Sequence, residues 1–328
     1  MLNKLISDIA IAKQKAKGQP AAAPEYITPL AGSGAVAGVE PSVTVDEETG
    51  QVYAINAYVE EVASGFDAPV RAYPKTLGLL LLGIMGTVKS TQVSEGPNHS
   101  HVFTVDPKSQ DTPWFTLWGN IEKEEIASTD AKLSELEISF EGNKPLECAA
   151  TFAAIGVEFG KKRPSGGTGM AGLKYFTPAG CEVKLDVAGQ SLEARKITKF
   201  ALKMSRNVEP EYFSGSPLPG DLAMGKFEAA PTFTLKPDSL EDVRKANTGS
   251  ASGTAIGGDV VEGAFSVKLT QGDFSLLIEA NRVPFKVAWP ESDAGGGAVE
   301  LEVSAENLLG TYEEGPLKVT LVNDVAKY

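Results

Sequence analysis

The chain has 328 residues, of which 42% are hydrophobic, and a formal net charge of −13. This length allows one large domain or two smaller ones with a substantial core, and the hydrophobic fraction excludes wholesale disorder. The acidic balance lacks the basic excess that tight nucleic-acid binding requires, so nucleic acid is not expected as a high-affinity ligand, although an acidic protein can still contain or pass DNA that it repels.

Cysteine content and hydropathy indicate whether the chain forms disulfides, spans a membrane or is secreted. Only two cysteines occur, Cys148 and Cys181, which favours reduced thiols over a disulfide framework. The longest apolar run, Leu77 to Met85, is too short for a membrane helix. Asp8 interrupts what would be the apolar region of a secretory signal, so we expect a protein that is made and used without crossing a membrane.

The N-terminus carries an apolar pattern at helical spacing. Lysines and then Gly18 and Pro20 follow it, which predicts a short amphipathic helix with cations in its last turn. From Gly18 to Gly38 the composition is mostly Ala, Gly, Pro and Ser, as in a tether. We therefore predict a helix and flexible arm over residues 1–24 and a β domain over residues 25–328. The predicted arm contacts are Leu2, Leu5, Ile6 and Ile9.

Such a helix has no core of its own, so its apolar stripe must be covered by a neighbouring subunit or by a membrane surface. The acidic remainder of the chain would be repelled by anionic lipid, which favours the subunit. We expect no membrane partner.

Two further helices are predicted. Pro74 is suited to the first turn of a helix and Gly86 to its end. We expect this helix to pack on a sheet and to carry no chemistry, and the predicted packing residues are Leu77, Leu80, Leu81 and Ile84. Asp238 to Lys245, acidic at its start and basic at its end, is predicted as a short helix.

The remaining periodic segments are typical of strands. Because they do not alternate with helices, the predicted fold class is mainly β, an antiparallel β-sandwich or barrel with a flanking α-helix. Long loops are expected over 160–174 and 247–258, and the first of them, rich in Lys, Arg and Gly, is expected to be mobile or ordered only by a partner. The predicted strands are Gln51–Val62, Val102–Val105, Phe115–Trp118, Cys181–Val187, Ile197–Val208, Ala230–Leu235, Phe265–Leu269, Phe274–Glu279, Val283–Trp289, Val299–Ser304 and Leu317–Asn323.

The segment from Leu133 to Phe159 is the clearest hairpin in the sequence. Its first strand alternates strictly, with Leu136, Ile138 and Phe140 on one face, and an Asn/Gly/Pro turn precedes its return. The opposite face is acidic rather than merely polar, and its residues are Glu135, Glu137 and Ser139.

No constellation predicts catalysis, a cofactor or a metal. Gly167, Gly169 and Gly172 match G-x-G-x-x-G by letter, but no helix follows, so a plain glycine-rich loop is the better interpretation. His99 and His101 would lie on one side of an extended segment, yet two imidazoles with only commonplace carboxylates nearby do not define a metal site. No catalytic residue pair stands out.

The order of motifs between Gly65 and Trp118 resembles a known family. Gly65 to Gly86 contains Pro-x-x-Leu-Gly-x-Leu-Leu-like spacing and ends in glycine, His101-Val-Phe-Thr104 follows, and then the strand Trp114–Trp118 and the hairpin from Leu133. This arrangement resembles the tail tube (major tail) proteins of long-tailed bacteriophages. The resemblance extends over roughly Val52 to Asn323.

The resemblance implies a structural virion protein without enzymatic activity. It implies a β-sandwich that forms stacked, hexameric rings, completes its sheets by that assembly, and surrounds a bore through which DNA passes. Glu135, Glu137 and Ser139 would face this bore, and Leu2, Leu5, Ile6 and Ile9 would make contacts between rings. The implied partners are the chain itself, a tape-measure protein, a tail terminator and distal tail or baseplate proteins, and the implied location is the virion tail, with the host cytoplasm during assembly.

Two alternatives stay open from the sequence. One is a tube or ring component of a contractile injection or secretion machine. The other is a carbohydrate-binding or hydrolytic β-sandwich, which would need exposed aromatic side chains. Trp114, Trp118 and Trp289 lie in strand-like runs, where core packing is the commoner role, so this alternative is not favoured.

Overall fold

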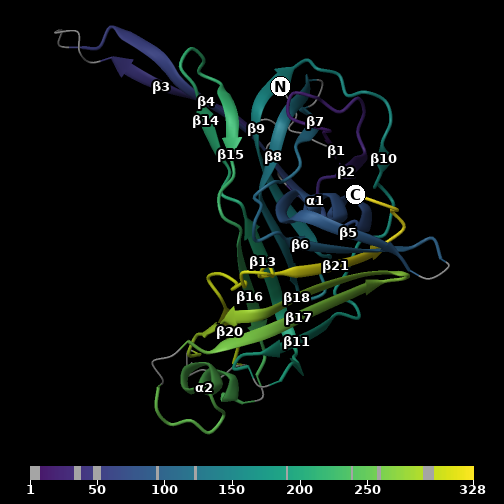
Figure 1. The fold of residues 1–328 in the computed structure, drawn as a ribbon, viewed down its shortest axis with the longest axis vertical. Helices are drawn as coiled ribbons and strands as arrows, with labels where there is room; N and C mark the ends of the chain where they lie inside the picture. The colour runs from purple at the N-terminus through teal and green to yellow at the C-terminus, as the bar shows by residue number, and fades with distance from the viewer. Residues whose placement is uncertain are drawn as a thin grey trace.

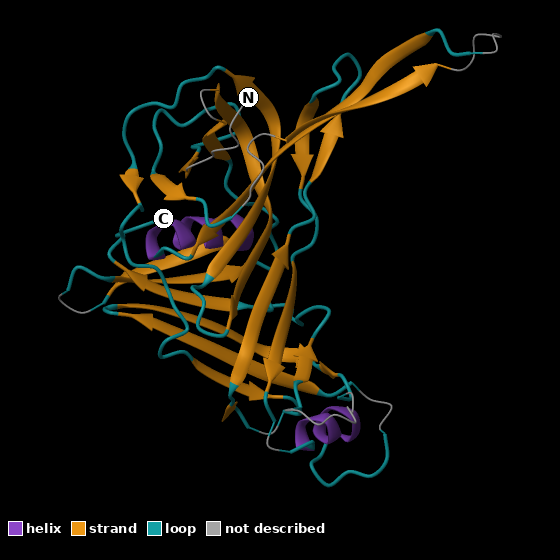
Figure 2. Cartoon of the chain, turned by 180° about the vertical axis from the view of Figure 1, so that it is seen from behind, coloured by secondary structure: helices purple, strands orange, loops and turns teal. Residues whose placement is uncertain are grey.

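The structure, a computed structural model, describes residues 8–32, 38–46, 53–93, 96–121, 124–189, 191–237, 239–256, 260–290 and 299–328. It is mainly β, with the long strands of one sheet crossing those of a second and one helix between them (Figures 1 and 2). The helices are α1 (Pro74–Met85) and α2 (Glu241–Thr248). The strands are β1 (Asp8–Lys13), β2 (Tyr26–Pro29), β3 (Gly38–Asp46), β4 (Asn56–Arg71), β5 (Gly86–Gln92), β6 (His99–Val105), β7 (Phe115–Ile121), β8 (Glu124–Glu141), β9 (Glu147–Phe159), β10 (Thr168–Gly169), β11 (Glu182–Asp186), β12 (Glu193–Ala194), β13 (Ile197–Ser205), β14 (Glu209–Tyr212), β15 (Pro219–Ala223), β16 (Glu228–Leu235), β17 (Glu262–Gln271), β18 (Phe274–Pro284), β19 (Lys286–Val287), β20 (Leu301–Ser304) and β21 (Lys318–Asn323).

Two sheets form the body. The larger runs β10-β2-β1-β7-β8-β13-β16-β20-β19, with β9, β4 and β3 attached to it through β8. The second runs β12-β11-β17-β18-β21-β6-β5, and β14 and β15 form a small sheet of their own. Apart from the short β10–β2 pair, the pairings are antiparallel, which confirms the predicted mainly-β, antiparallel class.

Strand β8 organises the larger sheet because it changes partner along its length. Its first half pairs with β7 and its second half with β13, while β9 follows it on the other edge throughout. The registers shift near Asp130, which has a positive φ of 53°, and near Ser134. Such irregularities bend a strand and increase its twist, and they lie here where the neighbour changes. The predicted hairpin Leu133–Phe159 is therefore the central hairpin of the fold.

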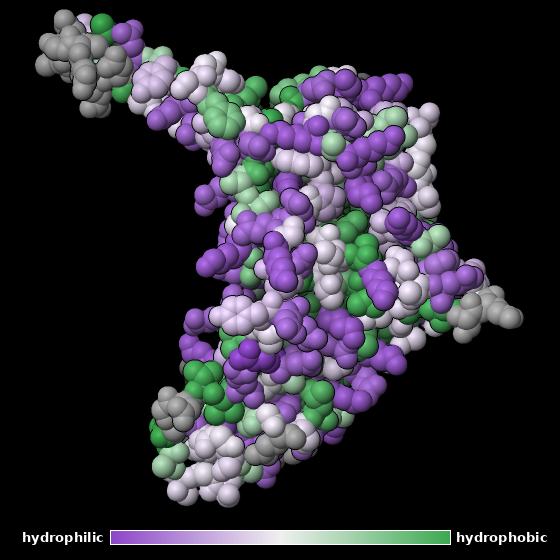
Figure 3. Space-filling model, in the orientation of Figure 1, coloured by the Kyte–Doolittle hydropathy of each residue, from purple (hydrophilic) through white to green (hydrophobic). Residues whose placement is uncertain are grey.

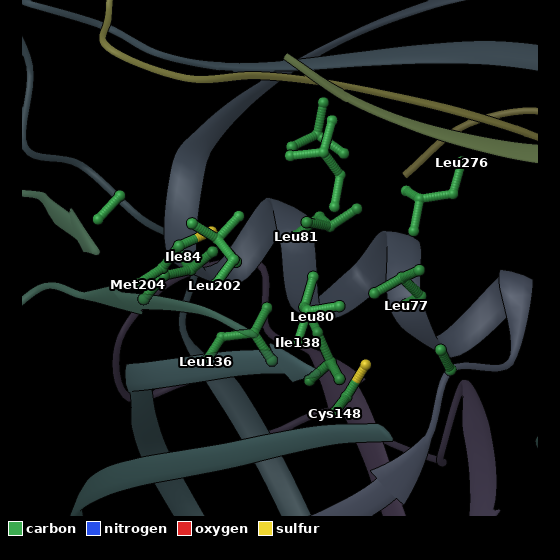
Figure 4. Packing of buried hydrophobic residues seen from close by; sticks show 14 of the residues in the cluster. Leu77, Leu80, Leu81, Ile84, Leu136, Ile138, Cys148, Leu202, Met204 and Leu276 are labelled. Atoms are coloured by element: carbon green, nitrogen blue, oxygen red, sulfur yellow. The ribbon is translucent and has the colours of Figure 1, made fainter. Parts of the chain in front are cut away.

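Helix α1 fills the space between the two sheets. Its sequence is apolar on every side, as befits a helix buried all round, and Leu77, Leu80, Leu81 and Ile84 all lie in the core. Figure 4 shows Leu80 over Ile138 of β8, and Ile84 beside Leu202 and Met204 of β13.

The C-terminal end of α1 is closed by a buried cation. The Arg206 side chain donates from Nε to the carbonyl oxygen of Ile84 at 2.8 Å and from Nη2 to that of Met85 at 3.1 Å. The helix then ends at Gly86, whose φ of 87° suits glycine. A positive group at this end also complements the helix dipole. Arg206 thus satisfies carbonyls that no helical amide can reach.

The lower part of the core is held by aromatic rings. Phe140, Phe200 and Phe233 lie on neighbouring strands of the larger sheet with centroids 5.7 and 5.2 Å apart. Phe233 continues the row to Phe265 of the second sheet at 5.3 Å. These contacts join the two sheets where α1 does not reach.

The predicted N-terminal helix is wrong for the residues that the structure describes. Asp8–Lys13 forms strand β1, which lies between β2 and β7. Ile9 and Ile11 enter the main core, and Ala10 and Ala12 are buried on the other face. Neither face of β1 is therefore exposed to solvent at these positions. Ile9 is buried in its own protomer, so it does not make the contact with another chain that was predicted for the N-terminal helix. Leu2, Leu5 and Ile6 lie outside the described residues.

The predicted tether and the domain boundary at residue 24 need the same correction, because β1 before the boundary pairs with β2 after it in one sheet. Residues Tyr26–Pro29 form β2 within the larger sheet, with Thr28 buried. Other differences are smaller. Strand β4 continues nine residues past the predicted end at Val62 to Arg71, and Val283–Trp289 is divided between the end of β18 and β19.

Candidate assembly surfaces

The outer half of the β3–β4 hairpin projects from the body (Figure 1). We call it the arm and define it by residues Gly38–Asp46 and 56–64. Strand β4 joins the sheet only from Gly65 onward, where it pairs with β9. On the arm, large apolar side chains are exposed: Val43 to 58%, Tyr58 to 55% and Val59 to 47%. This exposure could not be predicted from the sequence, because alternation predicts a strand but not whether a sheet covers it.

The arm has two chemically different faces. Residues directly opposite one another in an antiparallel pair lie on the same face, and Val43 faces Val59 while Val45 faces Ala57. The other face is polar, with Ser42 opposite Glu61 and Thr44 opposite Tyr58. The register shifts after Ser42, where Glu60 is the extra residue, and this shift keeps the valines of both strands together.

The base of the arm is braced by the β14–β15 hairpin. The amide of Val62 donates to the carbonyl of Pro217 at 2.8 Å. Lys17, which follows β1, forms an ion pair with Asp221 of β15 at 2.8 Å and donates to the carbonyl of Gly220. The arm is thus tied at its root to the β14–β15 hairpin, and Lys17 holds that hairpin to the segment after β1.

The exposed face of β8 is less acidic than the sequence indicates. Glu135, Glu137 and Ser139 do share this half-buried face, but β13 places Lys203 beside them, and its Nζ lies 3.0 Å from Oε2 of Glu135. Lys199, opposite Glu141, adds a second cation. The face is therefore a mosaic of both charges.

The long loop over residues 160–181 crosses the side of the body away from the arm (Figure 1). It was expected to be mobile or ordered only by a partner, and that expectation is wrong. Met170 and Phe176 are fully buried, and backbone amides of Thr168 and Met170 donate to Glu25 and Ile27. Its basic side chains remain at the surface, where Arg163 pairs with Asp8 at 2.6 Å. We call it the basic loop.

The two histidines are structural. His101 is buried between Ser90, whose Oγ lies 2.8 Å from Nδ1, and Asn323, whose Oδ1 lies 3.1 Å from Nε2. Burial lowers its pKa from the usual histidine range, so the ring is neutral near pH 7. His99 stacks beside it at 6.3 Å. Across the described ranges, no group of three or more potential ligands is placed to hold a metal ion.

The thiols and the glycine-rich run have equally plain environments. Cys148 and Cys181 are both free, and burial raises the pKa of Cys148 to about 12 and of Cys181 to about 11, so neither is an activated nucleophile. Gly167 to Gly172 belongs to the basic loop and leads into no helix. No helix in the described part of the chain is long and apolar enough to cross a bilayer.

The tryptophans divide differently from the prediction. Trp118 is buried, and Trp114 is partly buried beneath Lys132, whose Nζ lies 4.5 Å from the ring centre. Trp289 is 73% exposed, so core packing was wrong for this residue. It follows the short strand β19, which pairs with β20. Strand β20 lies near α2 at the end of the molecule opposite the arm (Figure 1), and Figure 3 shows hydrophobic side chains at the surface of that end.

These features define a class of protein: a β-sandwich with a buried helix and large surfaces suited to contact with other chains. The chain matches the family model for phage tail tube proteins over residues 7–307, and it belongs to that family. None of the curated proteins compared with it gives a match. The protein is thus a structural component of the phage tail tube, its place is the virion tail, and association with itself and with other tail components is the family's general property.

Proposed function

We propose that this protein assembles into stacked, hexameric rings that form the tail tube, and that the tube is a conduit for DNA delivery. In this assembly the sheets of neighbouring protomers complete one another. The role is mechanical, and no catalytic step is involved.

The observation that carries the proposal is the arm. A two-stranded ribbon is at best marginally stable by itself in water, and this one presents a row of valines to solvent. Burying a valine side chain contributes roughly 1.5–3 kcal/mol, so a partner that covers Val43 and Val59 gains substantially. Because the arm is braced at its root, little ordering remains to oppose docking.

The same proposal places the face of Glu135, Glu137 and Ser139 on the bore. A wall of net negative charge repels DNA, and the lysine beside Glu135 limits that repulsion. On this proposal, Glu135→Lys with Glu137→Lys leaves assembly intact and slows DNA delivery, whereas Lys203→Glu leaves delivery at the wild-type rate. Equal rates of DNA delivery by the wild-type tube and both variant tubes would mean that this face does not line the bore.

The finer partners follow from the same role. A tape-measure protein would occupy the bore before DNA, a tail terminator would close the upper end, and distal tail or baseplate proteins would hold the lower end. Assembly would take place in the host cytoplasm. Support for these partners comes from family membership alone.

The decisive experiment is electron microscopy of the full-length protein, alone and with the other tail proteins, beside a variant without the arm. Gly38 and Gly65 are directly opposite each other, so an Asn-Gly turn can join them in place of residues 39–64. The wild-type chain should give rings or tubes with a central hole. The armless variant should keep the cooperative unfolding of the body and remain unassembled.

Two results would overturn the proposal. A wild-type chain that stays monomeric at every concentration, even with its tail partners, would exclude self-assembly. Normal tubes from the armless variant would show that the arm is not what joins the protomers.

A further inference from the structure

The arm belongs to a segment with an unusual charge distribution. From Gly18 to Val70 the sequence contains eight acidic residues and no lysine or arginine. On the arm itself, Glu40, Glu60 and Glu61 are exposed beside the valines. A surface that receives the arm should therefore combine apolar side chains with uncompensated cations.

The basic loop has this combination. Residues 160–181 contain Lys161, Lys162, Arg163 and Lys174 and no acidic residue. Lys162 and Lys174 are exposed, and neither has an ion-pair partner among the described residues. Exposed apolar side chains occur toward its two ends, since Leu173, next to Lys174, is 45% exposed and Phe159, the last residue of β9 before the loop, is 61% exposed.

Other exposed surfaces fit the arm less well. At the α2 end, Arg195 is already paired, with Glu193 and Asp242 each 2.9 Å away, and Lys286 lies 3.9 Å from Glu306, whereas Lys236 has no ion-pair partner among the described residues. On the exposed face of β8, Lys203 is paired with Glu135. Acidic side chains stand among the cations of both surfaces, so each should attract an acidic ribbon less than the basic loop does.

The positions of arm and loop decide what kind of contact they can make. They lie on opposite sides of the body, the arm on one side and β10 within the loop on the other (Figures 1 and 2). The arm therefore cannot reach the loop of its own protomer. A contact between them joins two copies head to tail, and head-to-tail contacts close into rings when the rotation between copies permits.

We propose that the arm of one protomer docks on the basic loop of its neighbour in the same ring. The valine face lies on Phe159 and Leu173, and Lys162 and Lys174 reach around the edge of the ribbon toward Glu60 and Glu61. This inference rests on the proposed self-assembly and specifies its lateral contact. The basic loop is held in place by the buried Met170 and Phe176, so the receiving surface exists before the arm arrives.

The test exchanges charge between the two surfaces. Glu60→Lys with Glu61→Lys, and separately Lys162→Glu with Lys174→Glu, should each raise the protein concentration required for ring formation by roughly tenfold or more, because like charges then meet. A chain that carries all four substitutions should assemble near the wild-type concentration. All three variants should unfold at the same urea concentration as wild type, since every altered side chain is exposed.

A matched pair of charge reversals at the α2 end tests whether the arm docks there instead of on the basic loop. Lys236→Glu with Lys286→Glu should leave assembly unchanged and should not restore the arm variant. If it does restore that variant, the arm docks on the α2 end of a stacked ring and the inference is overturned while self-assembly stands. Failure of the four-fold variant to recover would overturn it equally. If the wild-type chain itself forms no rings, the proposed function fails first.

Discussion

The two halves of strand β4 show how one strand serves two purposes. From Gly65 to Arg71 it pairs with β9, and Phe66, Ala68 and Val70 are buried in the core. From Asn56 to Ser64 the same strand pairs only with β3, and its apolar side chains face solvent. The inner half stabilises the protomer, whereas the outer half leaves its apolar side chains exposed and, in the proposed assembly, is covered by another chain. The apolar residues of one strand therefore have opposite consequences for folding and for assembly.

The largest expected effect lies on the inner half. Phe66→Ala removes a ring that is 1% exposed and should lower the free energy of unfolding by about 3–5 kcal/mol. Val59→Thr, on the outer half of the same strand, keeps a β-branched side chain and should change the free energy of unfolding by less than about 0.5 kcal/mol. Urea unfolding of the two variants measures both. Equal losses would mean that the arm is part of the protomer's cooperative unit.

A smaller loss is expected where α1 ends. Arg206→Met keeps much of the side-chain length but leaves the carbonyls of Ile84 and Met85 without their donors, at about 1–3 kcal/mol for each group. Removing a buried cation also removes its desolvation penalty, since burial lowers the pKa of Arg206. We therefore expect a net loss of roughly 2–3 kcal/mol. Arg206→Lys retains a cation with fewer donors, so its free energy of unfolding should lie between those of the wild-type chain and Arg206→Met. A Met variant as stable as wild type would refute the capping role.

Periodicity predicted the parts of the fold in which burial follows from the local sequence. Helix α1 is apolar on nearly all sides, and the second half of β8 alternates strictly, so both can be predicted from their own residues. Strand β1 was misjudged because it is buried on both faces, so its apolar residues carry no alternation and fit helical spacing as well.

The surfaces were harder to predict because they depend on neighbours that are distant in sequence. Glu135 and Glu137 were correctly placed on one face, but Lys203, which pairs with Glu135, comes from β13. The basic loop looked mobile because its anchors, Met170 and Phe176, are single residues in a polar run. The arm could not be distinguished from an ordinary strand, since its exposure depends on where β9 stops pairing.

The buried thiol on the inner side of the sheet makes stability depend on alkaline pH. Burial raises the pKa of Cys148 from 9.0 to about 12, so the folded state holds this proton more tightly than the unfolded state. The stabilisation is complete below pH 9 and declines as the pH rises toward 12. Between pH 8 and 10 we expect a loss of about 1 kcal/mol from this group.

Urea unfolding at pH 8, 9 and 10 measures that decline. In Cys148→Ala the free energy of unfolding should be lower at every pH and should fall less steeply between pH 8 and 10. Cys181→Ala should flatten this decline to a similar extent, because burial raises the pKa of Cys181 to about 11, which also lies above the pH range measured. An unchanged slope in Cys148→Ala would mean that other groups cause the alkaline loss.

The smallest expected effect on the protomer lies on the arm, and it is the one that most directly tests the contrast within β4. Val43→Thr with Val59→Thr keeps β-branched side chains of nearly the same shape, so the urea midpoint should not move. Each substitution should weaken docking by about 1 kcal/mol if a neighbour buries the side chain, which together raises the protein concentration needed for assembly by roughly tenfold or more. Sedimentation across a concentration series measures this shift, and Thr44→Val on the opposite face of the ribbon is the matched control. A shift of equal size and direction in that control would show that the valine face is not the docking face.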